Sequence, residues 1–237
     1  MAKFDREWIP KSAMTIFAHP DDTEFSCSGT VAKWVRGGCE VTCVLCTSGN
    51  VGTHDLKYTP ESLALLREEE QRKACAVLGV KHIEFLRHDD SRLVADLTLR
   101  RELVHLIRKY KPEIVFCSDP NQLFWGNNRI NHPDHRAAGL ATIDAIFPCA
   151  SMELLWPEEG PAHEVHGVYI RDLTYVDTWI DITDTLELKI NALREHHTQL
   201  DGFKGLGEMI RQRSAEIGKK QGLKYAEAFR VIRLIGD

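Results

Sequence analysis

The stretch MTIFAHPDDTEFSCSGTVAKWVRGGCEVTCVLC, residues 14–46, decides the fold class. Its apolar run Met14–Ala18 predicts a strand, and Thr23–Arg36 predicts a helix that ends at two glycines. A second apolar run, Glu40–Cys46, predicts another strand. A strand, a helix and a strand in this order form the unit from which parallel sheets are built, with the helix crossing over one face of the sheet.

The same alternation continues along the chain until Pro148, after which its rhythm changes. We therefore expect an α/β fold in a single domain, residues 1–237, with a Rossmann-like, mostly parallel sheet, helices on both faces and a C-terminal strand/helix elaboration. The further strands are expected at His82–Leu86, Ile114–Cys117, Val165–Ile170 and Tyr175–Ile180, and the further helices at Glu61–Leu78, Leu97–Tyr110, Asp134–Phe147 and Asp184–Leu200.

Composition and charge narrow the class of protein. Hydrophobic residues make up 43% and charged residues 27% of the 237 residues, as in an ordinary globular protein. The formal net charge is −5, which argues against binding to the phosphate backbone of a nucleic acid. No apolar run approaches the roughly 20 residues of a membrane span, and the N-terminus is too charged for a signal peptide.

The seven cysteines show no regular spacing, and we expect reduced thiols in a cytoplasmic protein. Cys43 and Cys46 form a CxxC pattern, but they fall within a predicted strand. Residues three apart in a strand point to opposite faces of the sheet, so we expect two buried core thiols rather than a metal site.

Two related turns carry the chemistry. His19-Pro20-Asp21-Asp22 follows the first predicted strand, and His132-Pro133-Asp134-His135 follows a loop after the fourth strand. Ligands of open α/β sheets bind at the carboxyl ends of the strands. Positions i and i+3 at a helical start share a face, so His19 can converge with Asp22 and His132 with His135. Together the two turns offer two to four nitrogen and oxygen ligands, which suits a zinc site.

A structural explanation exists for each turn alone. The aspartates can simply favour a helix N-terminus through the helix dipole. Two such turns at the functional edge of one sheet favour the metal site. Of the other histidines, most lack paired spacing, whereas His196 and His197 lie in a predicted helix, where one of them can face the site.

Two further segments border the expected crevice. Arg67 and Glu70 fall on the apolar stripe of the helix Glu61–Leu78, either as an Arg–Glu pair that locks the helix to the sheet or with Arg67 reaching toward a substrate. The sequence TSGNVG, Thr47–Gly52, lacks a phosphate-loop signature and is interpreted as a backbone wall for a ligand.

The chain resembles the PIG-L/LmbE-like zinc-dependent de-N-acetylases over nearly its whole length. The paired HPDD and HPDH motifs are the most specific part of this resemblance. The matching segments, in the order of the family, are AHPDDTEF at 18–25, TSGNVG at 47–52, REEEQRKACAVLGV at 67–80, SDP at 118–120, NHPDHRAAG at 131–139, DITDTLELKINAL at 181–193 with His197 and Gln199 beyond, and YAEAFRV at 225–231.

The resemblance implies a role for each residue of the two turns. It implies that His19, Asp22 and His135 hold Zn²⁺, with water completing the site, and that Asp21 is the general base. It also implies that a protonated His132 stabilises the oxyanion formed on the acetamide carbonyl and that Asp134 orients His132. The implied activity is hydrolysis of an N-acetylated amino sugar or its conjugate, of the N-acetylglucosamine type, to free amine and acetate.

Two places depart from the family pattern and bear on the substrate. Asn50 stands where the family often has an acidic residue, and the loop Asp119–Ile130 is particular to this chain. We expect Asn50, Arg67 and Trp125 to contact the substrate, and the resemblance implies a homo-oligomer, a trimer or a hexamer. The alternatives are an amidase acting on a thiol-conjugated amino sugar, a non-enzymatic Rossmann-like ligand-binding domain, and a nucleic-acid-processing metalloenzyme that the net charge disfavours.

Overall fold

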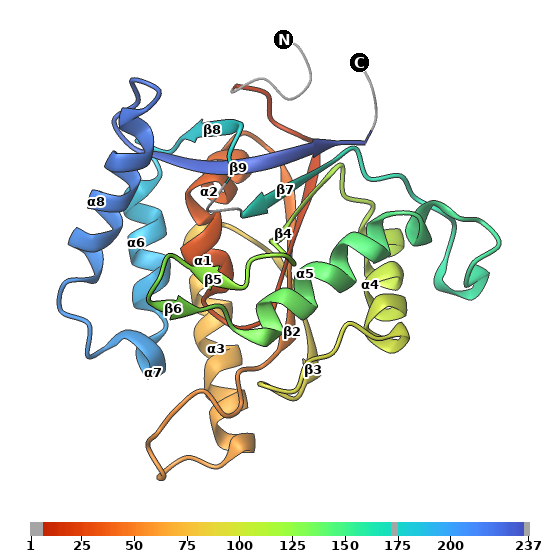
Figure 1. Ribbon diagram of the computed structural model, residues 1–237, viewed down its shortest axis with the longest axis horizontal. Helices are drawn as coiled ribbons and strands as arrows, with labels where there is room; N and C mark the ends of the chain where they lie inside the picture. The colour runs from red at the N-terminus through yellow and green to blue at the C-terminus, as the bar shows by residue number, and fades with distance from the viewer. Residues whose placement is uncertain (1–6, 172–174, 235–237) are drawn as a thin grey trace.

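The computed structural model describes residues 7–171 and 175–234. Its centre is a seven-stranded sheet in the order β3-β2-β1-β4-β7-β9-β8, in which neighbours from β3 to β7 are parallel and β9 is antiparallel to both β7 and β8 (Figure 1). This arrangement confirms the mostly parallel α/β sheet. The strands are β1 Ser12–Phe17, β2 Glu40–Thr47, β3 His82–His88, β4 Ile114–Ser118, β7 Gly167–Arg171, β8 Thr178–Asp181 and β9 Ala226–Arg233.

Helices cover both faces of this sheet, as expected (Figure 1). The core on one face contains side chains of α2, α3, α6 and α8, and the core on the other face contains side chains of α4 and α5. The helices are α1 Asp22–Ser26, α2 Ser28–Arg36, α3 Pro60–Leu78, α4 Leu97–Tyr110, α5 Pro133–Ile146, α6 Leu186–Arg194, α7 His197–Leu200 and α8 Leu206–Lys219, with short 3-10 turns η1 Cys149–Ser151 and η2 Pro157–Glu159 and a small hairpin of β5 Phe124–Trp125 and β6 Arg129–Ile130.

Side chains alternate between the two cores along the central strands. Phe17 packs in the core beneath α2 and α3, whereas Ile16 packs in the core beneath α4 and α5. Cys43 and Cys46 likewise belong to opposite cores, and all seven cysteines are free and buried. The CxxC pattern is therefore a pair of separated core thiols, as the strand period predicts.

The first predicted helix, Thr23–Arg36, is in fact two helices that meet at Cys27, whose φ of −143° ends α1. The carboxylate of Glu227 accepts hydrogen bonds from the backbone amides of Gly29 and Thr30, so it caps the start of α2. Lys189 Nζ lies 2.6 Å from the same carboxylate and neutralises it. A residue of the last strand thus fixes the joint between α1 and α2, which no local pattern announces.

The C-terminal region is more regular than its polar, glycine-punctuated sequence suggests. The predicted helix Asp184–Leu200 ends already at Arg194, and the segment beyond it folds into α7, α8 and β9. Strand β9 lies inside the sheet, between β7 and β8, although its sequence AEAFRVIR mixes charged and apolar residues. Within the described residues, no helix has the length and apolarity needed to cross a lipid bilayer.

Candidate active site

The fold brings the two His-Pro-Asp turns together at the carboxyl edge of the sheet. His19 follows β1, and His132 caps the N-terminus of α5, with Pro133 in its first turn. Gln71 on α3 accepts a hydrogen bond from the backbone amide of Asp21, which has a positive φ of 95°. This left-handed residue, a conformation that aspartate tolerates, turns the chain so that Asp21 and Asp22 point in different directions.

Three side chains converge with geometry suited to a metal ion. His19 Nδ1 lies 3.5 Å from Asp22 Oδ2 and 3.3 Å from His135 Nε2, and His135 Nε2 lies 3.1 Å from Asp22 Oδ1. One ligand-type atom from each residue falls within 4.8 Å of the others. Two imidazole nitrogens and a carboxylate oxygen form the donor set of a catalytic zinc site that keeps a position open. These residues therefore fit the metal that the sequence resemblance implies.

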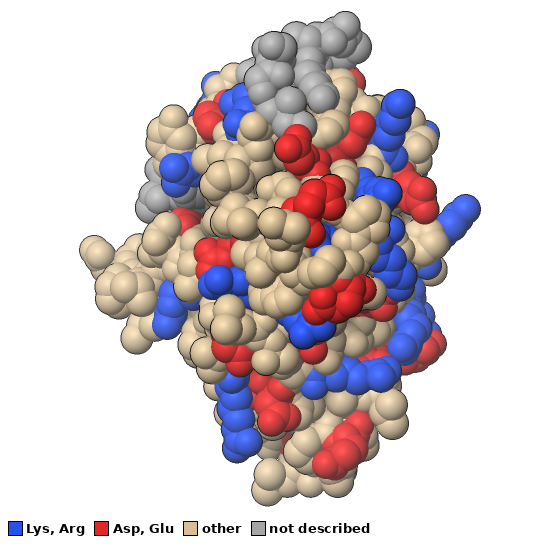
Figure 2. Space-filling model, turned by 90° about the vertical axis from the view of Figure 1, so that its right-hand side faces the viewer, with Lys and Arg blue, Asp and Glu red and all other residues tan. Residues whose placement is uncertain are grey.

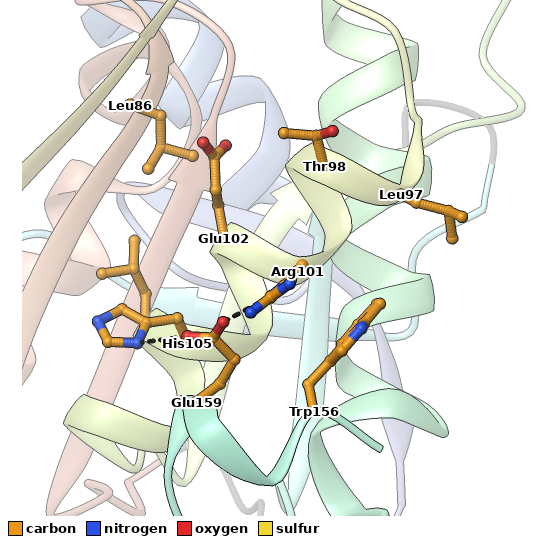
Figure 3. A pocket seen from close by; sticks show the side chains of 9 residues that line it. Leu86, Leu97, Thr98, Arg101, Glu102, His105, Trp156 and Glu159 are labelled. Carbon is orange, nitrogen blue, oxygen red and sulfur yellow. Dashed lines mark hydrogen bonds and ion pairs between the residues drawn. The ribbon is translucent and has the colours of Figure 1, made fainter.

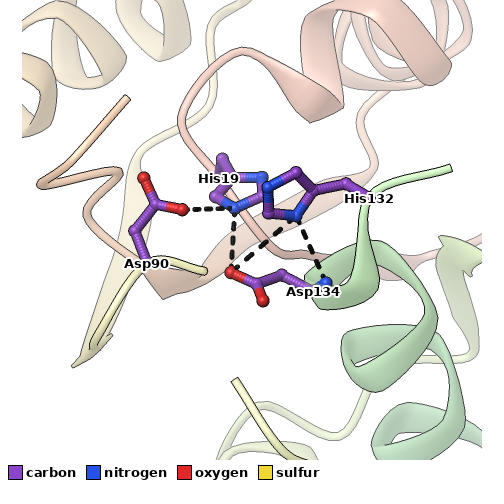
Figure 4. Close-up of side chains that lie close together, drawn as sticks. All are labelled: His19, Asp90, His132 and Asp134. Atoms are coloured by element: carbon purple, nitrogen blue, oxygen red, sulfur yellow. Dashed lines mark hydrogen bonds and ion pairs between the residues drawn. The ribbon is translucent and has the colours of Figure 1, made fainter. Parts of the chain in front are cut away.

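The far nitrogens of both imidazoles have partners that orient the rings. His135 Nδ1 is hydrogen-bonded to Asn131 Oδ1 at 3.2 Å. His19 Nε2 lies 3.2 Å from Asp134 Oδ2 and 3.2 Å from Asp90 Oδ1, as Figure 4 shows. A carboxylate on the outer nitrogen of a ligand imidazole fixes its tautomer and raises its basicity. The nitrogen of His19 that faces Asp22 and His135 is accordingly Nδ1.

Asp90 is a site residue that our sequence analysis missed. Asp90 stands just after β3, at the edge of the sheet where ligands bind. This position after a strand is the feature of the sequence that could have indicated it. Its side chain is buried, and its backbone amide donates to Asn50 Oδ1. Burial acts against the charged form, but hydrogen bonding to His19 lowers the pKa of Asp90 to about 2. Asp90 is thus a buried carboxylate held in its charged form beside His19.

Asp134 contacts His19 more closely than it contacts His132. Its carboxylate is fully buried and accepts hydrogen bonds from the amides of Ser91 and Leu93. The distance from its Oδ2 to His132 Nδ1 is 4.0 Å, whereas the Asp134 backbone amide donates to that nitrogen at 3.2 Å. In this structure Asp134 orients His132 through its backbone amide. Orientation of His132 by the Asp134 carboxylate stays a prediction.

Burial and neighbouring charges shift the pKa values of Asp22, His19 and His132. Burial opposes the charged form of Asp22, but His135 and His19 hold its pKa well below the ordinary value. Burial also opposes the charged form of His19, yet hydrogen bonds to Asp134 and Asp22 raise its pKa well above that of a free imidazole. The pKa of His132 is lowered, chiefly by burial and then by the neighbouring His19. The charge state of each of these side chains therefore depends on that of its neighbours.

Asp21 lies beside the three residues without joining them. Burial raises its pKa to about 6, although the charge of Arg67, whose Nη2 lies 3.5 Å from Asp21 Oδ2, acts in the other direction. Behind it, His196 Nε2 lies 3.3 Å from Glu24 Oε2, and both of these side chains are fully buried. Of the two adjacent histidines, His196 is thus the one that faces the site.

Arg67 joins the two loops that border the site. It is 3% exposed and donates to the carbonyl oxygens of Pro20 and Gly49. Gly49 has a φ of 63°, and a Cβ atom there would lie 2.1 Å from Arg67 Nη1, so this position requires glycine. Glu70, the partner that the helical stripe suggested, bonds instead to Thr198. The geometry gives Arg67 a positioning role between the loops, and a direct substrate contact stays a prediction.

Trp125 stands on the β5–β6 hairpin, and the guanidinium groups of Arg129 and Arg171 each lie 5.1 Å from its ring centre. It lines a small hollow together with His135, at the edge of the convergent residues. A cavity of about 570 Å³ lies elsewhere, between α4 and the η2 turn, where Arg101 and His105 point toward Glu159 (Figure 3). It contains none of the expected site residues.

The surface that carries α4 bears charges of both signs. Figure 2 shows Lys and Arg interspersed with Asp and Glu on the visible face rather than gathered into a basic stripe. Several of these charges form ion pairs, such as Arg101 with Glu158 and Lys109 with Glu84. This face is therefore a mixed, solvated surface.

The fold and the site together define a protein of the α/β class with a cluster of His and Asp side chains at the carboxyl edge of its sheet that can hold a metal ion. The model of the PIG-L family, GlcNAc-PI de-N-acetylase, matches residues 14–146, more than half of the chain. The chain belongs to this family, which confirms the family resemblance seen in its sequence.

Individual relatives agree with the family. The chain is 33% identical to the diacetylchitobiose deacetylase of Thermococcus kodakarensis over 94% of its own length and 83% of the relative. It is 30% identical to a 1D-myo-inositol 2-acetamido-2-deoxy-alpha-D-glucopyranoside deacetylase of Acidothermus cellulolyticus, with 86% of each chain covered. The structure of N,N'-diacetylchitobiose deacetylase from Pyrococcus horikoshii superposes with a TM-score of 0.87 at 29% identity, covering 97% of this chain and 88% of the other. These relatives confirm the N-deacetylase class.

Proposed function

We propose that this chain is a zinc-dependent hydrolase that removes the acetyl group from an N-acetylated amino sugar or its conjugate, of the N-acetylglucosamine type, and releases acetate. The observation that carries the proposal is the convergence of His19, Asp22 and His135, with Asp21 beside them. The names of the relatives, which are deacetylases of N-acetylated sugars, support the same substrate class.

His19, Asp22 and His135 would hold the zinc ion through Nδ1, a carboxylate oxygen and Nε2. Zinc in such a site supplies a Lewis acid that polarises a carbonyl and lowers the pKa of a water molecule to about 7. The protein orients these donors through Asn131, Asp134 and Asp90, so the site is organised by the chain itself.

Asp21 is the proposed general base. Its carboxylate lies beside the three ligands, 3.5 Å from Arg67 Nη2, and is only 17% exposed. A carboxylate oxygen of Asp21 accepts a proton from the attacking water. The same oxygen later returns this proton to the nitrogen of the departing amine, because one carboxylate can serve as base and then as acid. Arg67 keeps Asp21 in place by holding the carbonyl of the preceding residue, Pro20.

His132 is proposed to stabilise the oxyanion that forms on the acetamide carbonyl. Its ring stands edge-on to the ring of His19, with the centres 4.7 Å apart, and its side chain is 37% exposed. Because Nδ1 accepts a hydrogen bond from the backbone amide of Asp134, Nε2 is the nitrogen that can donate a hydrogen bond to the oxyanion. Asn50 and Trp125 are proposed to contact the sugar at the two sides of the crevice.

Metal analysis and acetate release test the proposal. Protein purified without chelator is expected to contain zinc, and acetate is expected from N-acetylglucosamine or diacetylchitobiose. His135→Ala is expected to lose both the metal and the activity. A metal-free protein with intact His19 and His135, or one that binds these sugars without releasing acetate, would favour the ligand-binding alternative instead. Release from thiol-conjugated substrates alone would favour the amidase alternative.

We also propose a cytoplasmic location and a homo-oligomer, a trimer or a hexamer. Seven free, buried thiols suit a reducing compartment. Light scattering coupled to size exclusion measures the oligomeric state, and a monomer at micromolar concentration would contradict the proposal. Fractionation of the producing cells tests the location.

A further inference from the structure

A second cavity, of about 380 Å³, lies between α8, β8 and the start of β9, beside α1. We call it the cationic pocket. Its volume falls within the range of small-molecule sites. Its lining includes the charged residues Arg171, Arg213, Glu216 and Lys220 and the aromatic residues Phe25 and Trp179.

The cationic pocket is joined to the candidate active site through Arg171. Arg171 is the last residue of β7 and pairs with Ser118 of the parallel strand β4, so it stands at the same carboxyl edge as His19. It also lines the small hollow that contains His135, and its guanidinium stacks over Trp125. One side chain therefore borders both the proposed sugar subsite and the cationic pocket.

The charges of the pocket do not balance. Lys189 and Glu227 neutralise each other at 2.6 Å, which leaves Arg171, Arg213 and Lys220 against the one carboxylate of Glu216 among the described lining residues. Arg213 and Lys220 stand at the rim, and neither forms an ion pair with a residue in the described part of the chain. The excess of positive charge is notable in a protein whose net charge is −5.

Arg171 is partly buried, whereas Arg213 and Lys220 are exposed. Burial lowers the pKa of the Arg171 guanidinium, Asp22 acts to raise it, and the nearby positive charge of Arg213 lowers it further. An arginine always stays protonated in proteins, so the two like charges face one cavity. Its walls also include the aromatic rings of Phe25 and Trp179. Positive side chains around an aromatic-walled cavity favour an organic molecule with a negative group.

We propose that the cationic pocket binds the acidic group, a carboxylate or a phosphate, of a small molecule, through Arg171, Arg213 and Lys220. We further propose that this group belongs to the conjugate attached to the amino sugar. The second statement rests on the proposed function, whereas the first does not. The enzyme would then select acidic conjugates over neutral ones, because the sugar at Trp125 places its substituent beside Arg171.

The first experiment measures binding of inorganic phosphate to the zinc-loaded protein by calorimetry. It compares the native chain with the double variant Arg213→Gln/Lys220→Gln and with a control, Lys73→Gln/Lys219→Gln, whose lysines are exposed and outside the pocket. We expect saturable binding that the pocket variant weakens by about tenfold or more and the control leaves unchanged. No saturable binding, or equal loss in both variants, overturns the proposal.

The second experiment compares acetate release from the phenyl and 4-carboxyphenyl glycosides of N-acetylglucosamine. We divide kcat/KM for the acidic 4-carboxyphenyl glycoside by kcat/KM for the neutral phenyl glycoside. This ratio is expected to fall about tenfold in the pocket variant and to stay unchanged in the control. If the pocket variant loses phosphate binding but keeps the ratio unchanged, the acidic group does not belong to the substrate. The ligand of the pocket is then a free anion. If neither glycoside is hydrolysed by any form, the proposed function fails, and the phosphate titration alone decides the pocket.

Discussion

His19 Nε2 and Asp134 Oδ2 lie 3.2 Å apart, although their residues are 115 positions apart in the chain. This contact links the two His-Pro-Asp turns directly, through the side of the imidazole that faces away from the proposed metal. Asp90 approaches the same nitrogen at the same distance. The ring of His19 is thus held by one carboxylate from the first turn of α5 and one from the loop after β3, which aims its Nδ1 at Asp22 and His135.

Removing either carboxylate should weaken the metal site. Asp134→Asn and Asp90→Asn are each expected to lower zinc affinity by about 10–100-fold, because a neutral amide orients and polarises the ligand imidazole less well. Competition with a chromogenic chelator measures the dissociation constant. Asp89→Asn is the matched control, since Asp89 is the neighbouring aspartate and its side chain is 65% exposed. Unchanged zinc affinity in both variants would show that these contacts do not support the metal ligand.

Asp21→Asn should separate metal binding from turnover. The change keeps the shape of the side chain, and asparagine also tolerates the left-handed backbone at this position. We expect the zinc content to stay full and kcat to fall by about 10²–10⁴, the usual contribution of a positioned general base. Steady-state kinetics with metal analysis on the same sample measures both. A variant with full activity would exclude Asp21 as the base.

Arg67→Met distinguishes a positioning role from a direct substrate contact. The substitution leaves the carbonyls of Pro20 and Gly49 without their buried donor, which costs about 1–3 kcal/mol for each group. We expect a lower free energy of unfolding, measured with urea, together with a lower kcat. Arg72→Met, on the same helix but 45% exposed, controls for the loss of charge. A rise in KM with unchanged stability would instead assign Arg67 to the substrate.

Glu68 should make stability depend on pH in the acid range. Burial acts against its charged form, but hydrogen bonds from Arg87 and Ser48 hold its pKa below the ordinary value of 4.5. Because the pKa is lower in the folded state, the carboxylate stabilises the fold fully above the unfolded pKa, and this contribution is lost as the pH falls through the folded pKa.

The difference in unfolding free energy between the native chain and Glu68→Gln should therefore be constant at neutral pH and shrink below about pH 4.5. Urea unfolding at a series of pH values measures it. Glu69→Gln, at an exposed neighbouring position, is expected to show a smaller difference. A difference that grows toward low pH would contradict the sign of this linkage.

The sequence predicted the parts of the fold that depend on local patterns. Apolar runs and glycine stops located β1, β2 and the crossover between them, and the carboxyl-edge rule directed attention to His19 and His132. The break at Cys27 could not be predicted in this way, because its cause is Glu227, about two hundred residues away. Strand β9 was missed for a related reason: its polar residues are satisfied by tertiary partners, so its sequence lacks clean alternation.

Contacts that join distant loops were equally hidden. Asp90 was overlooked because nothing in its own sequence distinguishes it from the adjacent Asp89, and only folding places it against His19. The apolar stripe of the helix correctly predicted that Arg67 faces the site. It could not predict that the guanidinium donates hydrogen bonds to two backbone carbonyls. Residue type and periodicity predict the direction in which a side chain points. The residue that it contacts depends on which loops the fold brings together.

The position of β9 inside the sheet also constrains how the protein is made. Strand β8 pairs with β9, and β9 pairs on its other side with β7, both of which precede it in the chain. While the ribosome is still adding residues 226–233, β8 has no strand to join and Glu227 has not reached α2. Because domains begin to fold during synthesis, the growing chain should stay vulnerable to proteases until β9 has emerged from the ribosomal tunnel.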